Sequence, residues 1–226
     1  MSNVKNPDAG ADSINRANSK LSCMPVKTEA DLMDDQIQLE RAGTYELLGS
    51  LFAQAPGQEV LDVLRGMDVV DASAGRVAMG WELLRKASLA HQREQIKEEH
   101  FNLFVGMGRG ELVPFGSWYL TGFLMEKPLS ELRSDLKGLG IARQEGVRNS
   151  EDHIAGVCDA MAIIIRHGNE IDFDRQKAFF DTHLAPWVGD FFADLQRAEA
   201  ADFYRAAGFF GEAFADVERE YFAMHA

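Results

Sequence analysis

The chain of 226 residues has only two cysteines, Cys23 and Cys158, and they are far apart in the sequence. Neither belongs to a Cys-x-x-Cys pair, which excludes a zinc ribbon and a thioredoxin-type redox motif. The sequence also lacks an uninterrupted apolar run of about 18 residues, so we expect no segment that inserts stably into a membrane. Cys158 lies on the apolar side of a helical pattern, where burial as a small hydrophobic residue is the expected role.

The common sequence templates of enzymes and metal sites are absent as well. No histidine follows a glutamate by three residues, which excludes the Glu-x-x-His ligand pair of carboxylate-bridged di-iron bundles. The chain contains no His-Glu-x-x-His zinc motif, no phosphate loop, no Gly-x-Gly-x-x-Gly fingerprint and no Gly-x-Ser-x-Gly elbow. We therefore expect no catalytic residues, no metal site and no cofactor.

Residues 1–30 lack apolar periodicity and are rich in small and polar residues, so we expect a disordered N-terminal tail before one domain over 31–226. The tail has no apolar segment typical of a secretory signal, and the chain has no Arg-Arg pair, so the expected location is cytoplasmic. The formal net charge is −13. Such acidity disfavours nucleic-acid binding and favours a basic peptide partner, although acidity also simply aids solubility.

Apolar residues recur at helical spacing from about residue 31 onward. Tyr45, Leu48 and Phe52 share one face of the first expected helix, which Pro56 and Gly57 end. The other helices are expected around 59–66, from about 73, up to 106, over 117–127, over 128–140, over 154–165, on both sides of Pro186 and over 203–221. The glycine-rich segment 106–119 is an expected loop. Since no run of alternating β-branched residues occurs, the predicted fold is all-α, a single globular domain of about eight to ten helices.

Three adjacent titratable residues, Glu151, Asp152 and His153, stand at the head of one apolar stripe. Asn149 or Ser150 can serve as the N-cap, which places the two acidic residues in the first turn, where the helix dipole favours negative charge. This local role explains the two carboxylates without any function. It does not explain His153, because a cation is disfavoured at a helix N-terminus.

Three segments, in order, resemble the TorD/DmsD family of cytoplasmic chaperones for molybdoenzymes. EEHFNLFVG (98–106) is similar to the family's aromatic-x-x-Leu-Phe segment, PFGSWYL (114–120) to its Pro-aromatic-Gly-Ser-x-Tyr segment, and SEDHIA (150–155) to its Glu-Pro-x-Asp-His signature. The likeness covers roughly residues 35–225. The chain departs from the family pattern at Asn149 and Ser150, which replace Glu-Pro, at His100, which replaces an aromatic residue, and at Phe115, where some relatives have Trp.

The resemblance implies a chaperone rather than an enzyme. Such a protein binds the N-terminal signal, often a twin-arginine peptide, or the apo-form of a molybdoenzyme during cofactor insertion and before export. Residues 119–143 look most like members that accompany formate dehydrogenases. Some relatives form domain-swapped homodimers, and weak guanine-nucleotide binding is associated with the family, although no phosphate loop is visible here.

The residues expected to bind the client all lie in these three segments: His100, Leu103, Phe104, Phe115, Ser117, Tyr119, Glu151, Asp152 and His153. Asp152 and Glu151 would provide carboxylates for arginine, and the apolar side chains would form the floor of a groove. His153 would hold Asp152 in orientation or bond a peptide carbonyl. Asp152→Ala is then predicted to lower peptide affinity and to leave the fold intact.

Other interpretations remain open from the sequence. Plain core packing explains Leu103, Phe104 and Tyr119 equally well. A metal-binding helical protein or enzyme that uses His100, Asp152 and His153 together is the rival functional class, and a helical scaffold for folded partners is a third.

Overall fold

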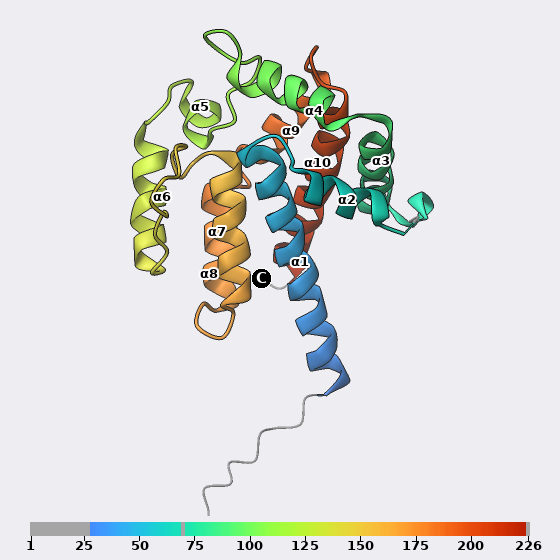
Figure 1. The fold of residues 1–226 in the computed structure, drawn as a ribbon. Helices are drawn as coiled ribbons and strands as arrows, with labels where there is room; N and C mark the ends of the chain where they lie inside the picture. The colour runs from blue at the N-terminus through green and yellow to red at the C-terminus, as the bar shows by residue number, and fades with distance from the viewer. Residues whose placement is uncertain (1–27, 69–70, 225–226) are drawn as a thin grey trace, which may run out of the picture.

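The computed structural model describes residues 28–68 and 71–224, apart from the side chains of residues 30 and 31. A disordered tail was expected over residues 1–30, and residues 1–27 of it lie outside the described residues. Residues 29 and 30 belong to the first helix. The described residues form ten α-helices and no β-strand, which confirms the all-α prediction (Figure 1). The helices are α1 Glu29–Ala53, α2 Gln58–Gly66, α3 Arg76–Ala90, α4 Arg93–His100, α5 Gly116–Thr121, α6 Lys127–Gly138, α7 Ile154–Arg166, α8 Phe173–His183, α9 Val188–Arg197 and α10 Phe203–Met224. A π-helix, Phe101–Val105, directly continues α4, and a short 3₁₀ turn, Ala72–Ala74, precedes α3.

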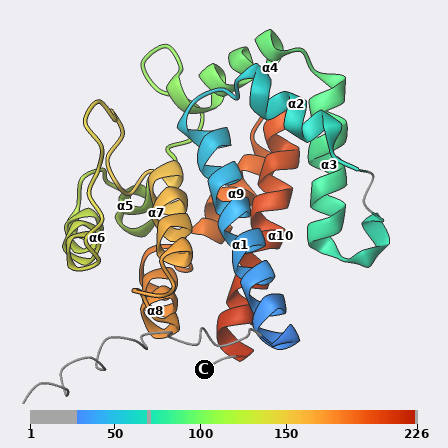
Figure 2. The ribbon, with the colours of Figure 1, turned by 60° about the horizontal axis from the view of Figure 1, so that its bottom comes forward.

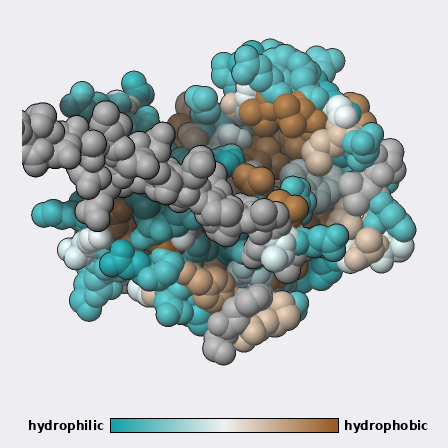
Figure 3. Space-filling view, turned by 90° about the horizontal axis from the view of Figure 1, so that it is seen from below, coloured by the Kyte–Doolittle hydropathy of each residue, from teal (hydrophilic) through white to brown (hydrophobic). Residues whose placement is uncertain are grey.

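The long helices form the centre of the molecule. Helix α1 packs along α7, and α10 packs against both α3 and α9. In both ribbon views α5 and α6 lie on one side of this central group, while α2 and α3 lie on the opposite side (Figures 1 and 2). From the end at which α1 begins, most of the visible surface is hydrophilic, and a hydrophobic area lies towards the upper right (Figure 3).

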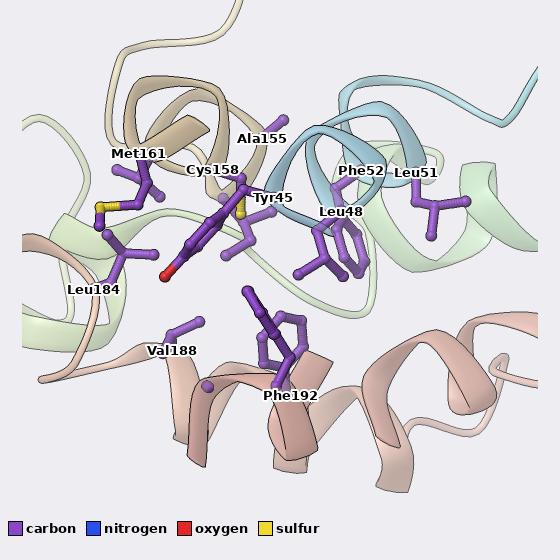
Figure 4. Close-up of a cluster of buried hydrophobic side chains, with 14 of the residues drawn as sticks. Tyr45, Leu48, Leu51, Phe52, Ala155, Cys158, Met161, Leu184, Val188 and Phe192 are labelled. Atoms are coloured by element: carbon purple, nitrogen blue, oxygen red, sulfur yellow. The ribbon is translucent and has the colours of Figure 1, made fainter. Parts of the chain in front are cut away.

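The core joins α1 and α7 to the C-terminal helices through large apolar side chains (Figure 4). The ring of Phe52 lies at the centre of an aromatic cluster, with centroid distances of 5.5 to 6.0 Å to Phe104, Phe191, Phe192 and Tyr204. These distances are in the range where aromatic pairs attract each other beyond simple burial. The apolar stripe predicted for residues 154–165 is buried as expected, including the thiol of Cys158, whose pKa burial raises.

Two buried carboxylates fix α10 at its ends. Glu99 of α4 accepts hydrogen bonds from the backbone N–H groups of residues 202, 203 and 204 at 2.7 to 3.1 Å, so it caps the start of α10 from a different helix. Glu218 accepts two hydrogen bonds from the guanidinium of Arg41, at 2.6 and 2.8 Å, and one from the hydroxyl of Tyr45 at 3.0 Å. Both buried charges, on Arg41 and Glu218, are therefore paired with each other, and this ion pair holds α10 against α1.

The structure differs from the sequence expectation in two helices. The helix expected over 117–127 was wrong beyond Thr121, because Gly122 adopts a left-handed conformation with φ 80° and Met125 also has a positive φ of 61°. The stripe expected on the last helix was wrong near its end. Val217 is 46% exposed, and Glu218 is buried in its place because it pairs with Arg41.

The loop predicted over 106–119 is confirmed for residues 106–115, whereas residues 116–119 already belong to α5; the loop folds back onto the π-helix. The N–H of Glu111 donates to the carbonyl of Asn102 at 3.1 Å, and that of Leu112 donates to Leu103 at 2.8 Å. Gly110 lies so close to this backbone that an added Cβ would sit 2.5 Å from the carbonyl oxygen of Leu103. The loop therefore needs glycine at this position to stay packed on the turn that carries the first motif.

Candidate functional site

The second and third motifs of the sequence bind each other directly. Phe115 and His153 form an isolated antiparallel bridge. The N–H of Gly116 donates to the carbonyl of Asp152 at 2.8 Å, and the N–H of Ile154 donates to the carbonyl of Pro114 at 2.9 Å. The start of α5 is thus fastened to the start of α7, although the two segments are 35 residues or more apart in sequence. We call this contact the clasp.

Asp152 lies inside the clasp and is only 3% exposed. One carboxylate oxygen accepts hydrogen bonds from the backbone N–H of Ser117, at 3.0 Å, and from the Ser117 hydroxyl. The other oxygen accepts from the Ser150 hydroxyl at 2.6 Å. Both oxygens are therefore committed to neighbouring residues, and hydrogen bonds of this kind to a charged acceptor are strong.

His153 is the N-cap of α7, so the expected cap at Asn149 or Ser150 was wrong, and the two acidic residues precede the helix rather than form its first turn. The Nδ1 atom of His153 accepts a hydrogen bond from the N–H of Ala155 at 3.2 Å. An imidazole that accepts at Nδ1 carries its proton at Nε2. The sequence did not suggest this cap because a charged histidine is disfavoured there, whereas a neutral one is a suitable acceptor.

Burial keeps the His153 ring neutral. His153 is 5% exposed, and its ring packs edge to face against Phe115, with centroids 4.9 Å apart. Desolvation lowers the pKa of His153 to about 4; the charge of Asp152 opposes this shift, and His100 adds to it. At neutral pH His153 is therefore an uncharged donor at Nε2.

Glu151 is occupied by arginines of the same chain. Its carboxylate lies 2.8 Å from a guanidinium nitrogen of Arg133 in α6 and 3.9 Å from one of Arg143 in the following loop. Partial burial alone would raise the pKa of Glu151, but the hydrogen bond from Arg133 and the charges of both arginines hold it below its ordinary value. Glu151 thus neutralises cations that are already present.

The first motif forms the end of α4 and the π-helix. The N–H of Gly106 donates to the carbonyl of Phe101 at 2.7 Å, which closes the wider turn. Leu103 is fully buried in the core, whereas Phe104 is half-buried and its ring lies 5.1 Å from the ring of His100. The Nε2 atom of His100 is buried and has no hydrogen-bond partner among the described residues. Burial also lowers the pKa of His100, against a hydrogen bond with the backbone of Phe52.

These elements surround one cleft of about 960 Å³. Its walls are the end of α1, the junction of α4 with the π-helix, one face of α7 and the loop 141–151. Five of the nine expected client-binding residues line the cleft: His100, Phe104, Phe115, Glu151 and His153. The first and third motifs, together with part of the second, therefore meet at a single depression.

The other four expected residues, Leu103, Ser117, Tyr119 and Asp152, do not line the cleft. Leu103 and Ser117 are completely buried, and Asp152 lies in the clasp. Tyr119 stacks on Trp187 with a centroid distance of 5.8 Å, and its hydroxyl donates to Asp194 at 3.2 Å. Burial, followed by the nearby negative charge of Asp194, raises the pKa of Tyr119.

Sequence reasoning missed the face of α7 that lines the cleft. Ala155, Gly156, Asp159 and Ile163 face it, at the spacing of three or four residues that marks one side of a helix. Partial desolvation and the charge of Glu46 raise the pKa of Asp159. The only signal in the sequence was an acidic residue, between small residues, inside an otherwise apolar helix.

Within 28–68 and 71–224, no group of three or more histidine, cysteine or acidic side chains is arranged to hold a metal ion. His100, Asp152 and His153 do not form such a group, because the oxygens of Asp152 and the Nδ1 atom of His153 already have partners. No described helix combines the length and the hydropathy that crossing a membrane requires.

Comparison with known proteins assigns the chain to a family. The family model described as "Nitrate reductase delta subunit" matches residues 71–193. The chain is 25% identical over 202 residues to "Chaperone protein TorD" of Vibrio vulnificus (strain YJ016), covering 80% of this chain and 94% of that one. It is 24% identical over 207 residues to "Chaperone protein TorD" of Vibrio atlanticus (strain LGP32), with coverage of 81% and 95%.

Among solved structures, a match is the "Crystal Structure Of A Putative Redox Enzyme Maturation Protein From Archaeoglobus Fulgidus". The two chains are 17% identical and superpose with a TM-score of 0.49. The alignment covers 79% of this chain and 93% of the other. Because the family model matches more than half of the chain, the chain belongs to the nitrate reductase delta subunit family, and its relatives place it with the TorD/DmsD-type proteins that its three motifs resemble.

Proposed function

We propose that this protein is a cytoplasmic maturation chaperone for a molybdoenzyme and that its cleft receives the N-terminal signal peptide of the apo-enzyme. Family membership and the names of the TorD relatives support the general role. The cleft supports the specific one, because its volume of about 960 Å³ lies at the upper end of the usual range for ligand sites. The proposed activity is binding without turnover.

A single observation carries this proposal: one cleft combines an aromatic wall with carboxylates. Phe104 and Phe115 offer apolar surface to the hydrophobic part of a signal peptide. Asp159 lies in the same cleft, where its carboxylate attracts a basic residue of the peptide. Such a peptide presents both kinds of group in sequence, so it can contact both parts of the cleft at once.

The two histidines of the cleft suit the backbone of an extended peptide. His153 is neutral and carries its proton at Nε2, so it can donate a hydrogen bond to a peptide carbonyl. His100 has a buried Nε2 atom without a partner among the described residues, and a bound peptide would satisfy it. Asp152 then acts as a positioning residue, because it holds the clasp that places His153 and Phe115 side by side.

Calorimetric titration with the signal peptide of a molybdoenzyme encoded beside this gene tests the proposal. We expect binding in the micromolar range and a higher melting temperature. Phe104→Ala should weaken binding roughly tenfold, since loss of an apolar aromatic contact is worth at least about 1.4 kcal/mol. Phe123→Ala is the matched control, because Phe123 is 68% exposed and lies outside the cleft. No heat and no change in melting temperature at tens of micromolar peptide would refute the proposal.

The proposed client is a formate dehydrogenase, on the likeness of residues 119–143 to members that accompany those enzymes. Titration with signal peptides of several molybdoenzyme classes tests this choice. Tighter binding of a different class would reassign the client and leave the chaperone role in place.

A further inference from the structure

We infer that Asp159 is the residue that receives a cationic side chain of the bound peptide, an arginine in preference to a neutral residue. This inference rests on the proposed function and assigns the recognition of charge to α7 rather than to Asp152 or Glu151. It makes Asp159 a specificity-determining residue of the cleft.

The position of Asp159 is set by close packing of two helices. Helix α7 presents Ala155, Gly156 and Asp159 to the cleft, and α1 passes beside them. At Gly49 of α1 an added Cβ would collide with the carboxylate oxygen of Asp159, and it would lie 3.5 Å from the carbonyl oxygen of Ala155. The carboxylate thus packs against the α1 backbone at Gly49, and Asp159 itself lines the cleft.

The charges of the cleft leave Asp159 available. Three carboxylates of the described residues line the cleft. Glu46 pairs with Arg166 at 2.7 Å, and Glu151 pairs with Arg133 at 2.8 Å. Asp159 has neither an ion pair nor a hydrogen bond among the described residues. The pKa of Asp159 is raised by desolvation and by the negative charge of nearby Glu46. A cation bound beside Asp159 would therefore relieve the repulsion between these two carboxylates.

The arginines of the cleft do not occupy this place. Arg143 donates to the carbonyl of Asn149 at 3.2 Å and lies near Glu151. Arg148 belongs to the same loop and forms no ion pair with Asp159 in the described part of the chain. A peptide arginine therefore meets a carboxylate that it does not first have to separate from a partner. Because Asp159 is exposed, the pair also costs less desolvation than a buried ion pair would.

The spacing along α7 sets the register of the peptide. Asp159 follows His153 by six residues, which corresponds to about 9 Å along a helix axis. An extended peptide covers that distance with about three residues. The basic residue of the peptide that pairs with Asp159 should therefore stand about three positions from the peptide residue that packs on His153 and Phe115. The apolar part of the signal would then be directed towards Phe104.

A double-mutant cycle tests this assignment. Wild-type protein and Asp159→Asn are titrated with the signal peptide and with peptides in which each arginine in turn is citrulline, which has the same shape without the charge. Wild type should prefer arginine at one position roughly tenfold, the factor for one hydrogen bond to a charged group that is partly exposed. Asp159→Asn should abolish that preference, and Asp159→Glu should restore part of it.

Asp190→Asn on α9 is the matched control, because it removes the same charge from an exposed aspartate outside the cleft. It should keep the preference for arginine. If wild type binds neither peptide, the proposed function fails. If wild type binds both equally, or if Asp159→Asn keeps the full preference, the proposed function stands and the assignment of Asp159 is overturned. The melting temperature of each variant confirms that the compared proteins are folded.

Discussion

Replacement of Asp152 by alanine should first reduce the stability of the protein rather than its affinity for a peptide. The substitution removes the acceptor of three hydrogen bonds, from the Ser117 N–H, the Ser117 hydroxyl and the Ser150 hydroxyl. Hydrogen bonds to a charged group contribute about 1.5–3 kcal/mol each. The hydroxyls can turn to other partners, whereas the buried N–H of Ser117 cannot, so we expect a net loss of about 3 kcal/mol in the free energy of unfolding.

Urea unfolding followed by circular dichroism measures this loss, and thermal unfolding should show a midpoint lower by roughly 6–12 °C for a domain of this size. Asp152→Asn should lose less than the alanine variant, because its amide oxygen still accepts from Ser117. Asp159→Asn serves as the matched control. The carboxylate of wild-type Asp159 has no partner among the described residues, and its pKa is raised. Removal of this charge should therefore leave the free energy of unfolding at neutral pH unchanged or raise it slightly.

A different outcome would refute this reasoning. The free energy of unfolding of Asp152→Ala could lie within about 0.5 kcal/mol of the wild-type value, the usual effect of a surface substitution. If that variant also no longer binds the peptide, Asp152 contacts the client directly. The expectation from the sequence, a hook for arginine with an intact fold, would then be correct, and the buried clasp would be of minor energetic importance.

Three further predictions concern the same framework. Glu99→Ala removes the acceptor of three N–H groups at the start of α10 and should lower the free energy of unfolding by about 2–3 kcal/mol, measured by urea unfolding. Gly211→Ala places a Cβ against the ring of Phe192 and should cost about 1–3 kcal/mol by the same assay, whereas Gly43→Ala, in open space, should not. His153 has a pKa of about 4 in the folded chain against an ordinary value of 6.5, so its stabilisation is complete above about pH 6.5 and is lost as the pH falls towards 4, by about 3 kcal/mol in total. His153→Asn keeps a cap acceptor and should flatten this pH profile, and an unchanged slope would contradict the neutral cap.

Helical periodicity predicted the fold well, because each long helix buries one regular stripe of apolar residues. The buried stripe of α7 and the two helices that meet near Pro186 are examples. The prediction failed where a distant partner decides the outcome. Val217 is exposed because Glu218 turns inward to Arg41, and no local pattern contains that pair.

The site could be predicted only in part, for a similar reason. The motifs correctly indicated which segments meet, but not which side chains face the cleft. Asp152 turns away because its partner Ser117 stands 35 residues earlier, and that contact exists only after the clasp has formed. Asp159 belongs to no motif, and the position of its carboxylate depends on the missing side chain of Gly49 on another helix.

The π-helix at Phe101–Val105 makes the aromatic wall depend on chain length. Its wider turn accommodates one residue more than an α-helical turn between the same ends, and it presents Leu103 inward while Phe104 faces the cleft. Deletion of a single residue here, for example the exposed Asn102, would let the segment wind as ordinary α-helix between the same ends and would turn the side chains inside it, Phe104 among them. The aromatic wall of the cleft can therefore change through the loss or gain of one residue, without any exchange of the aromatic residues themselves.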